Sequence, residues 1–187
     1  MTGAVPIVSI VAIALIALWA VWAFNRLIRY RNRTRSGWSD IDVQLQRRHD
    51  LIPQLVDAVA GYARFEQATL SAVTELRRLS NHAEHLADKA AVEDQVTDFA
   101  RQLIAVAEAY PDLKASQNFL ALQQELTKTE DTLQYARRFY NGAVREFNTC
   151  RESFPDRLVA GLFGFKAREF FQAEAGAAAP VKVELSQ

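Results

Sequence analysis

The chain has 187 residues, of which half are hydrophobic and 24% are charged, and its formal net charge is zero. This length suits one modest domain with an appendage. All 22 acidic residues but only 17 of the 22 basic residues follow position 35, so that part carries a charge of −5 and offers no basic face for nucleic acid. The single cysteine, Cys150, excludes an internal disulfide and fits a reducing compartment.

Residues 4–24 predict a transmembrane helix. Their sequence, AVPIVSIVAIALIALWAVWAF, holds no charge, and Ser9 is its one polar side chain. At a rise of about 1.5 Å per residue, this stretch reaches the ~30 Å of a bilayer's hydrocarbon core. Trp19, Trp22 and Tyr30 lie at its downstream end, where such rings favour the membrane–water boundary. A cleaved signal peptide would need basic residues before the apolar run, and none precede it. We therefore expect residues 4–24 to contact the lipid bilayer.

A basic juxtamembrane segment, residues 25–37, follows the apolar run. It holds five arginines, namely Arg26, Arg29, Arg31, Arg33 and Arg35. Because arginines resist translocation, we expect this end to stay in the cytoplasm and residues 1–3 to form a short outer N-terminus. The arginines would also attract anionic headgroups, although a topology signal is the main interpretation.

From Trp38 onward the sequence predicts helices. Apolar residues recur at a spacing near 3.5, which is typical of a buried helical face. They are Trp38, Ile41, Leu45, Ile52, Leu55, Val59, Tyr62, Val73 and Leu76.

Pro53 interrupts this stripe, and proline removes a backbone donor and clashes with the preceding turn. We therefore predict a bend after the polar residues 47–50, with Asp50 capping a new helix that begins near residue 51. Arg47 and Arg48 are expected to be solvated or to pair with acidic residues of neighbouring helices.

Residues 80–88 lack a period and predict a loop. A second stripe then steps by four and three residues through Val92, Val96, Phe99, Leu103, Val106 and Tyr110. This helix is expected to stop at Tyr110, because a residue before proline disfavours helical geometry, while Pro111 itself suits a first helical turn. The pattern predicts a tight corner between two helices.

A third stripe continues at a period of 3.5 for five heptads. Its members are Phe119, Leu122, Leu126, Thr129, Leu133, Ala136, Tyr140, Ala143, Phe147, Cys150 and Phe154. No segment predicts a strand. The predicted fold class is all-α, with the transmembrane helix continuing into an up-and-down antiparallel bundle of about four helices over residues 38–172, packed like a coiled coil.

Residues 154–171 form a separate unit with five phenylalanines, two glycines and several basic residues. They either close the end of the bundle or lie on a membrane surface. Packing is favoured, because aromatic stripes are usually core. The tail, residues 173–187, is predicted to be disordered.

The sequence contains no recognisable catalytic or metal-binding motif. A di-iron carboxylate bundle needs Glu-x-x-His motifs, and none of His49, His82 and His85 has a glutamate three residues before it. His82 and His85 are spaced for zinc, but nothing nearby completes four ligands. Cys150 lies on the third stripe and is expected to be a buried, inert thiol. We therefore predict no catalytic residue, no metal or cofactor site and no enzymatic activity.

Three glutamates raise the question of buried charge. Glu66 is in phase with the first stripe, Glu108 precedes the corner, and Glu130 lies near the third stripe. Candidate partners for Glu66 across the bundle are Lys114, Lys128 and Arg137. A structural polar layer that fixes the register of the helices is favoured over acid–base catalysis.

Three separated blocks occur in an order typical of one family. They are FNRLIRYRNRTRSGWSDIDVQLQRRHDLIPQLV (24–56), YPDLKASQNFLALQQELTKTEDTLQYARRFYNGAVREFN (110–148) and FPDRLVAGLFGFK (154–166). They closely resemble the LemA family, over nearly the whole chain beyond the membrane helix. The resemblance implies a single-pass protein of the bacterial inner membrane, with a short outer N-terminus and a cytoplasmic antiparallel bundle. Phe65, Asp131 and Gly142 depart from the family pattern, and Phe65, where histidine is common, weakens a metal site at Glu66.

The leading hypothesis is a non-enzymatic, membrane-anchored helical scaffold that binds itself or another membrane protein. An alternative is a metal-dependent enzyme or metal sensor that uses Glu66, Glu108, Glu130 and His49. The resemblance adds a third, because some relatives are linked with membrane remodelling in magnetosome formation and many are encoded near a membrane metalloprotease. It implies an adaptor that presents clients to such a protease.

Overall fold

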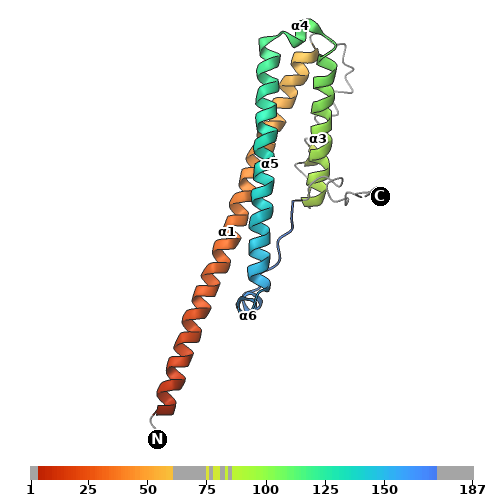
Figure 1. Cartoon of the computed structure of the whole chain (residues 1–187). Coiled ribbons are helices and arrows are strands. Elements are labelled where there is room, and N and C mark those ends of the chain that lie inside the picture. Colours follow the sequence, from red (N-terminus) through yellow and green to blue (C-terminus); the bar gives the residue numbers. More distant parts are fainter. Residues whose placement is uncertain (1–3, 61–74, 76–77, 81–82, 84–85, 172–187) are drawn as a thin grey trace, which may run out of the picture. The chain divides into compact units, whose positions relative to one another are not determined.

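The protein is all-α, which confirms the predicted fold class (Figure 1). The computed structural model describes residues 4–60, 75, 78–80, 83 and 86–171, and none of these lies in a strand. The helices are α1 (Ala4–Ala60), α3 (Leu86–Ala107), α4 (Pro111–Lys114), α5 (Gln117–Glu152) and α6 (Asp156–Leu162). The chain divides into two compact units. Unit 1 comprises residues 1–41 and 136–169, and unit 2 comprises residues 42–135 and 170–187.

Some predictions fall outside the described residues. They concern the outer N-terminus (1–3), Tyr62, Phe65, Glu66, Val73, Leu76, His82, His85 and the tail (173–187). The predicted domain limits, 25–37 and 38–172, stay predictions.

Helix α1 runs unbroken through Pro53, so the predicted helix start near residue 51 is wrong. Asp50 does not cap a helix. Its carboxylate accepts a hydrogen bond from Nε2 of Gln46 at 3.0 Å, and its backbone oxygen accepts one from Nε2 of Gln54 at 2.9 Å. Ile52 and Leu55, on either side of the proline, are both buried. Because packing holds the chain on both sides, the helix tolerates a proline that would cost about 3 kcal/mol in an isolated helix.

Unit 1 pairs the first part of α1 with the second part of α5 and with α6. The two long helices run antiparallel, since Arg33 contacts Glu146 (Nη1 to Oε2, 2.6 Å) and Gly37 lies against Tyr140. The buried core residues are Ala23, Leu27, Phe147, Cys150, Val159, Ala160 and Phe165. Cys150 is therefore buried, as predicted.

Gly37 allows α1 and α5 to approach closely. A Cβ atom at this position would lie 3.0 Å from Cδ1 of Phe139 and 3.2 Å from Cα of Tyr140. The next residue, Trp38, packs edge-on against Tyr140, with 5.7 Å between ring centroids. Glycine within a helix costs about 1 kcal/mol relative to alanine, and the close approach explains why it stands here.

Glycine also ends α6. Gly164 has a φ of 65°, in the left-handed region. The N–H of Phe165 donates to the oxygen of Ala160 at 2.9 Å, and the N–H of Gly164 donates to that of Gly161 at 3.3 Å, which together form a Schellman motif. Beyond it the chain is fixed to α5, because the amide of Asn148 bonds both the N–H and the carbonyl of Arg168 at 2.9 Å.

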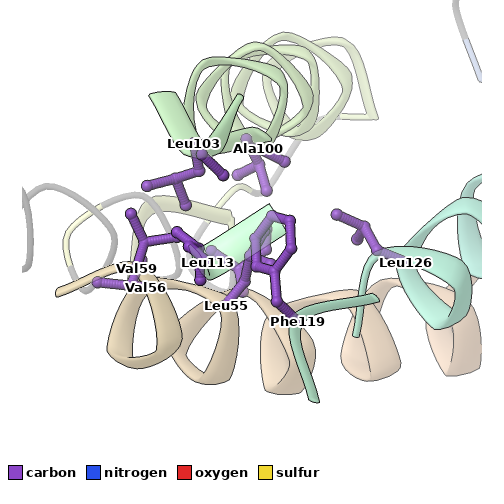
Figure 2. Packing of buried hydrophobic residues seen from close by; sticks show 11 residues of the cluster. Leu55, Val56, Val59, Ala100, Leu103, Leu113, Phe119 and Leu126 are labelled. Atoms are coloured by element: carbon purple, nitrogen blue, oxygen red, sulfur yellow. The ribbon is translucent and has the colours of Figure 1, made fainter. Parts of the chain in front are cut away.

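Unit 2 builds its apolar core from α1, α3, α4 and α5 (Figure 2). The buried members are Ile52, Leu55, Val56, Val59, Val96, Ala100, Leu103, Ala107, Leu113, Phe119 and Leu126. The predicted corner is present, because Tyr110 is extended (φ −119°, ψ 97°) and Pro111 begins α4. However, α3 ends at Ala107 rather than Tyr110. The predicted loop 80–88 is wrong at both ends, since Ser80 is helical and α3 begins at Leu86.

Candidate functional site

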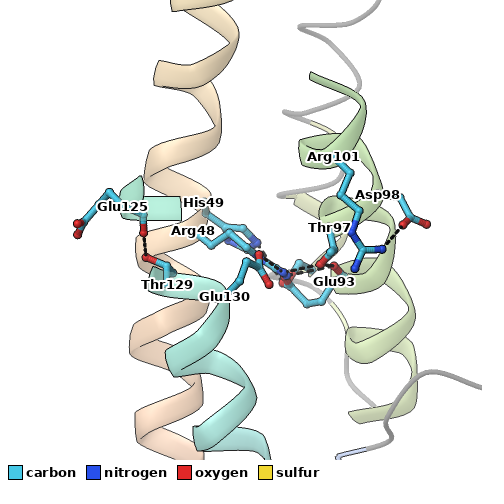
Figure 3. A network of polar contacts seen from close by, with 10 residues as sticks. Arg48, His49, Glu93, Thr97, Asp98, Arg101, Glu125, Thr129 and Glu130 are labelled. Atoms are coloured by element: carbon cyan, nitrogen blue, oxygen red, sulfur yellow. Dashed lines mark hydrogen bonds and ion pairs between the residues drawn. The ribbon is translucent and has the colours of Figure 1, made fainter. Parts of the chain in front are cut away.

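A cluster of polar side chains is buried inside unit 2 (Figure 3). We call it the Arg48 cluster, and its members are Arg48, His49, Ser80, Glu93, Thr97 and Glu130. The side chains of Arg48 and Glu93 are 0% exposed. Charged side chains are almost never fully buried unless they are paired, so the partners of these two groups decide what the cluster can do.

Arg48 occupies a core position of α1. The buried residues Ile41, Leu45, Arg48 and Ile52 are spaced by four, three and four, so the arginine continues the apolar stripe. Its long side chain lets a charged head reach beyond the apolar neighbours of its backbone.

One guanidinium group links three helices. Nη1 of Arg48 donates to Oγ1 of Thr97 on α3 at 2.7 Å and to Oε1 of Glu130 on α5 at 2.9 Å. Nη2 donates to the backbone oxygen of Glu93 at 3.1 Å and also to the Glu93 carboxylate. Figure 3 shows the arginine reaching from α1 toward these acceptors. A planar group with fixed donors sets both the distance and the register between the helices.

Glu93 collects the remaining partners. Its Oε1 accepts a hydrogen bond from Ser80 and lies 3.0 Å from Nε2 of His49, which is itself buried. Burial by itself would raise the pKa of Glu93, but the close contact with His49, the charge of Arg48 and the hydrogen bond from Ser80 outweigh it and lower the pKa to about 2. The glutamate is therefore charged at any physiological pH.

Serine, histidine and a carboxylate meet in this cluster, but not in a catalytic order. In a nucleophilic triad the imidazole lies between the hydroxyl and the carboxylate, so that it can take the hydroxyl proton. Here Glu93 lies between the other two, and the hydroxyl of Ser80 donates to the carboxylate. Ser80 is also buried, at 1% exposure, away from any substrate. The arrangement does not support nucleophilic catalysis.

The cluster also does not favour a metal site. Glu93 and Glu130 are the carboxylates nearest to His49 in it, and both already bind Arg48. A guanidinium stays charged at every relevant pH, so it holds the place that a cation would take. Within the described part of the chain, no three His, Cys, Asp or Glu side chains are grouped to hold an ion.

The predicted residues have different fates. Arg47 and Arg48 both pair with acidic residues, but only Arg48 is buried, whereas Arg47 forms a surface ion pair with Glu125. Glu130 forms an ion pair with Arg48, which was not among the candidate partners Lys114, Lys128 and Arg137. Glu108 lies at the surface, 55% exposed and paired with Lys114, so it belongs to no buried layer.

The sequence patterns did not indicate three members of the cluster, namely Glu93, Ser80 and Thr97. A signal for Glu93 existed, because the buried face of α3 runs through Glu93, Val96, Ala100, Leu103 and Ala107 at the same spacing as the predicted stripe. The predicted face began at Val92, one residue earlier. The face of α3 that is buried in the structure includes alanines. These small residues indicate burial less clearly than the larger Val92, Phe99 and Val106.

Unit 1 contains a second buried carboxylate, at the start of α6. Asp156 is 2% exposed, forms an ion pair with Arg26 of α1, and lies 3.4 Å from the thiol of Cys150. The ion pair joins α6 to the end of the apolar part of α1, with Cys150 as a weak donor between. Its role is therefore to position α6.

The fold and these sites define a class, namely all-α proteins that combine an apolar N-terminal helix with buried ion pairs between helices. Residues 37–185 match the LemA family, and the chain belongs to that family. Protein LemA of Metamycoplasma hominis is 31% identical over 150 residues, covering 80% of this chain and 68% of the relative. The magnetosome protein MamQ 2 of Paramagnetospirillum magneticum is 22% identical over 184 residues, covering 84% and 68%. MamQ of Magnetospirillum gryphiswaldense is 21% identical over 169 residues, covering 76% and 62%.

Proposed function

We propose that this protein is a non-enzymatic, membrane-anchored helical scaffold that binds itself or another membrane protein. Residues 4–24 of α1 cross the bilayer once, with the N-terminus outside and unit 2 in the cytoplasm. This orientation follows from the arginines that come after the apolar segment. The proposed location is the bacterial inner membrane, which the resemblance to the LemA family implies.

The observation that carries the proposal is the exposure of the first part of α1. Every residue from 7 to 18 is exposed, and the large side chains among them are all apolar, with Ile13 67% exposed. The helix is long and apolar enough to cross a membrane. An apolar surface of this kind on all sides of a helix is unfavourable in water, and lipid is the solvent that suits it.

The polar groups of unit 2 support a scaffold better than an enzyme. Arg48 and Glu93 are buried and form an ion pair with each other, which supports a structural role over contact with a substrate. The names of the relatives denote no reaction. Isolated large apolar side chains are exposed on unit 2, among them Val43 and Leu120, and give a partner protein places to contact.

Photocrosslinking in native membranes tests the proposal. A photoreactive residue replaces Val43 or Leu120, with exposed Lys128 as the matched control position. We expect mass spectrometry to identify a second copy of the chain or one defined membrane protein at the apolar positions. If labelling at Val43 and at Leu120 is no higher than at the control position Lys128, the result contradicts a scaffold.

Crosslinking and one further measurement separate the alternatives. Crosslinks to a membrane protease would favour the adaptor hypothesis over self-association. For the metal hypothesis, elemental analysis of the purified chain is decisive, because a stoichiometric metal ion would overturn the proposed function.

A further inference from the structure

The α6 segment, which we define as residues 154–168, exposes an apolar surface. Phe154, Leu158, Leu162 and Phe163 are 82%, 62%, 81% and 57% exposed. The opposite side of α6 packs into the core of unit 1 through Val159 and Ala160. Large apolar side chains gathered on the outer side of a helix indicate contact with lipid or with a partner.

The α6 segment packs beside the apolar end of α1. The rings of Phe163 and Phe24 lie 4.7 Å apart between centroids, and Asp156 is paired with Arg26. Trp19 and Ala20 of α1 are partly buried and pack against the core cluster that holds Val159. The apolar residues that pack against this cluster therefore begin at residue 19, within the predicted membrane-spanning segment 4–24, and Phe24 is in direct ring contact with the α6 segment.

Length then places the α6 segment at the membrane. A hydrocarbon core of ~30 Å requires about 20 helical residues. The predicted span 4–24 supplies this length as a whole, so residues 19–24 lie in the bilayer with the rest of it. The core cluster against which these residues pack includes Val159 and Ala160 of α6, and Phe24 contacts Phe163, so the α6 segment lies near the same depth.

Basic side chains line a pocket at the inner side of this segment. The pocket measures about 360 Å³, and its lining includes Arg31, Lys166 and Arg168, with Phe163 at its edge and no carboxylate among the lining residues. The guanidinium of Arg31 lies over the ring of Phe165 at 5.5 Å, and its buried Nε has no hydrogen-bond partner within the described part of the chain. Three cations around a hollow suit a phosphate group.

We propose that the α6 segment is a lipid-binding element. Its exposed apolar face inserts into the leaflet at the arginine-rich end of α1, and its basic pocket holds the phosphate of an anionic phospholipid. This inference rests on the proposed membrane anchor, since the depth of α6 follows from that of α1. Interfacial binding to membranes usually combines insertion of apolar side chains with attraction of basic groups to anionic headgroups.

Depth measurements on the full chain in bilayers test the insertion. A nitroxide is attached at Leu162 in a Cys150→Ser background, which keeps a donor to Asp156. Labels at Val11 and at the exposed Arg145 serve as lipid and water references. We expect the Leu162 label to be accessible to oxygen and protected from a water-soluble nickel chelate, as at Val11. A second label at Leu158, on the same face, guards against a folding defect at one site.

The outcomes separate the inference from its premise. If Val11 is lipid-exposed while both α6 labels behave like Arg145, the α6 segment does not insert and the inference fails, although the anchor stands. If Val11 also behaves like Arg145, the proposed anchor itself fails.

Lipid retention tests the pocket. The full chain is released from phosphatidylcholine nanodiscs with and without phosphatidylglycerol, and bound lipids are counted by native mass spectrometry. We expect retained phosphatidylglycerol, reduced about twenty-five-fold in Lys166→Gln/Arg168→Gln, because each basic group near an anionic surface contributes a factor of roughly five. The control, Lys128→Gln/Arg145→Gln, removes two exposed charges elsewhere and should retain the lipid. Equal loss in both variants, or displacement of the lipid by excess inorganic phosphate, would overturn the lipid assignment.

Discussion

Arg48 and Glu93 are both fully buried, and each depends on the other. We expect Arg48→Met to lower the free energy of unfolding by about 3–5 kcal/mol, because it leaves a carboxylate buried without its main partner. Adding Glu93→Leu should recover most of this loss, since apolar side chains of similar size often replace a buried ion pair at little cost. Denaturant unfolding of the purified chain in detergent, followed by circular dichroism, measures both. A double variant as unstable as the single one would show that pairing is not what the cluster provides.

The lowered pKa of Glu93, about 2 against an ordinary 4.5, makes stability depend on pH. A carboxyl whose pKa is lowered by folding stabilises the folded state above its unfolded pKa, and this stability is lost as the pH falls through the folded pKa. We expect the free energy of unfolding to decrease by on the order of 3 kcal/mol between about pH 4.5 and about pH 2 because of Glu93. Glu93→Gln should be less stable at neutral pH but converge with the wild type near pH 2. Parallel curves would contradict the assignment.

At the scale of the helix, two glycines offer a matched test of helix packing. Gly37 of α1 has Phe139 and the backbone of Tyr140 within 3.2 Å of its missing Cβ, whereas Gly142 of α5 has open space around it. Gly142→Ala should raise the free energy of unfolding by up to about 1 kcal/mol through helix propensity alone. Gly37→Val should lower it by about 1–3 kcal/mol, because α1 and α5 must separate. Thermal unfolding distinguishes them, and equal shifts would refute the close approach.

The helices also show how far periodicity reaches. The stripe predicted from Phe119 to Phe154 matches the inner face of α5, since its members up to Cys150 are buried or partly buried, whereas Phe154, beyond the end of α5, is exposed. The helix start predicted near Pro53 is wrong, because the local cost of a proline is outweighed in α1, where packing holds the flanking residues.

At the scale of the whole molecule, the membrane anchor makes a direct prediction. Ile13→Arg/Ile16→Arg should move the chain from the membrane pellet to the soluble fraction after an alkaline wash, since each central arginine opposes insertion by about 2.5–3.5 kcal/mol. Val43→Arg, an equally exposed apolar position on unit 2, is the control and should stay in the pellet. If the double variant stays in the pellet too, the apolar part of α1 is not what holds the chain there.

The sequence by itself determined the all-α class, the apolar helix and most inner faces, because these depend on spacing along one helix. Only the tertiary structure decided that Arg48 is buried and that Glu93 and Ser80 meet it, since a buried charge is stable only where partners from distant segments converge. The α6 segment shows the same division. Its composition allowed either packing or membrane contact, and the structure shows that one face packs on α1 while the other stays exposed, because a helix buried on one side still presents its opposite side outward.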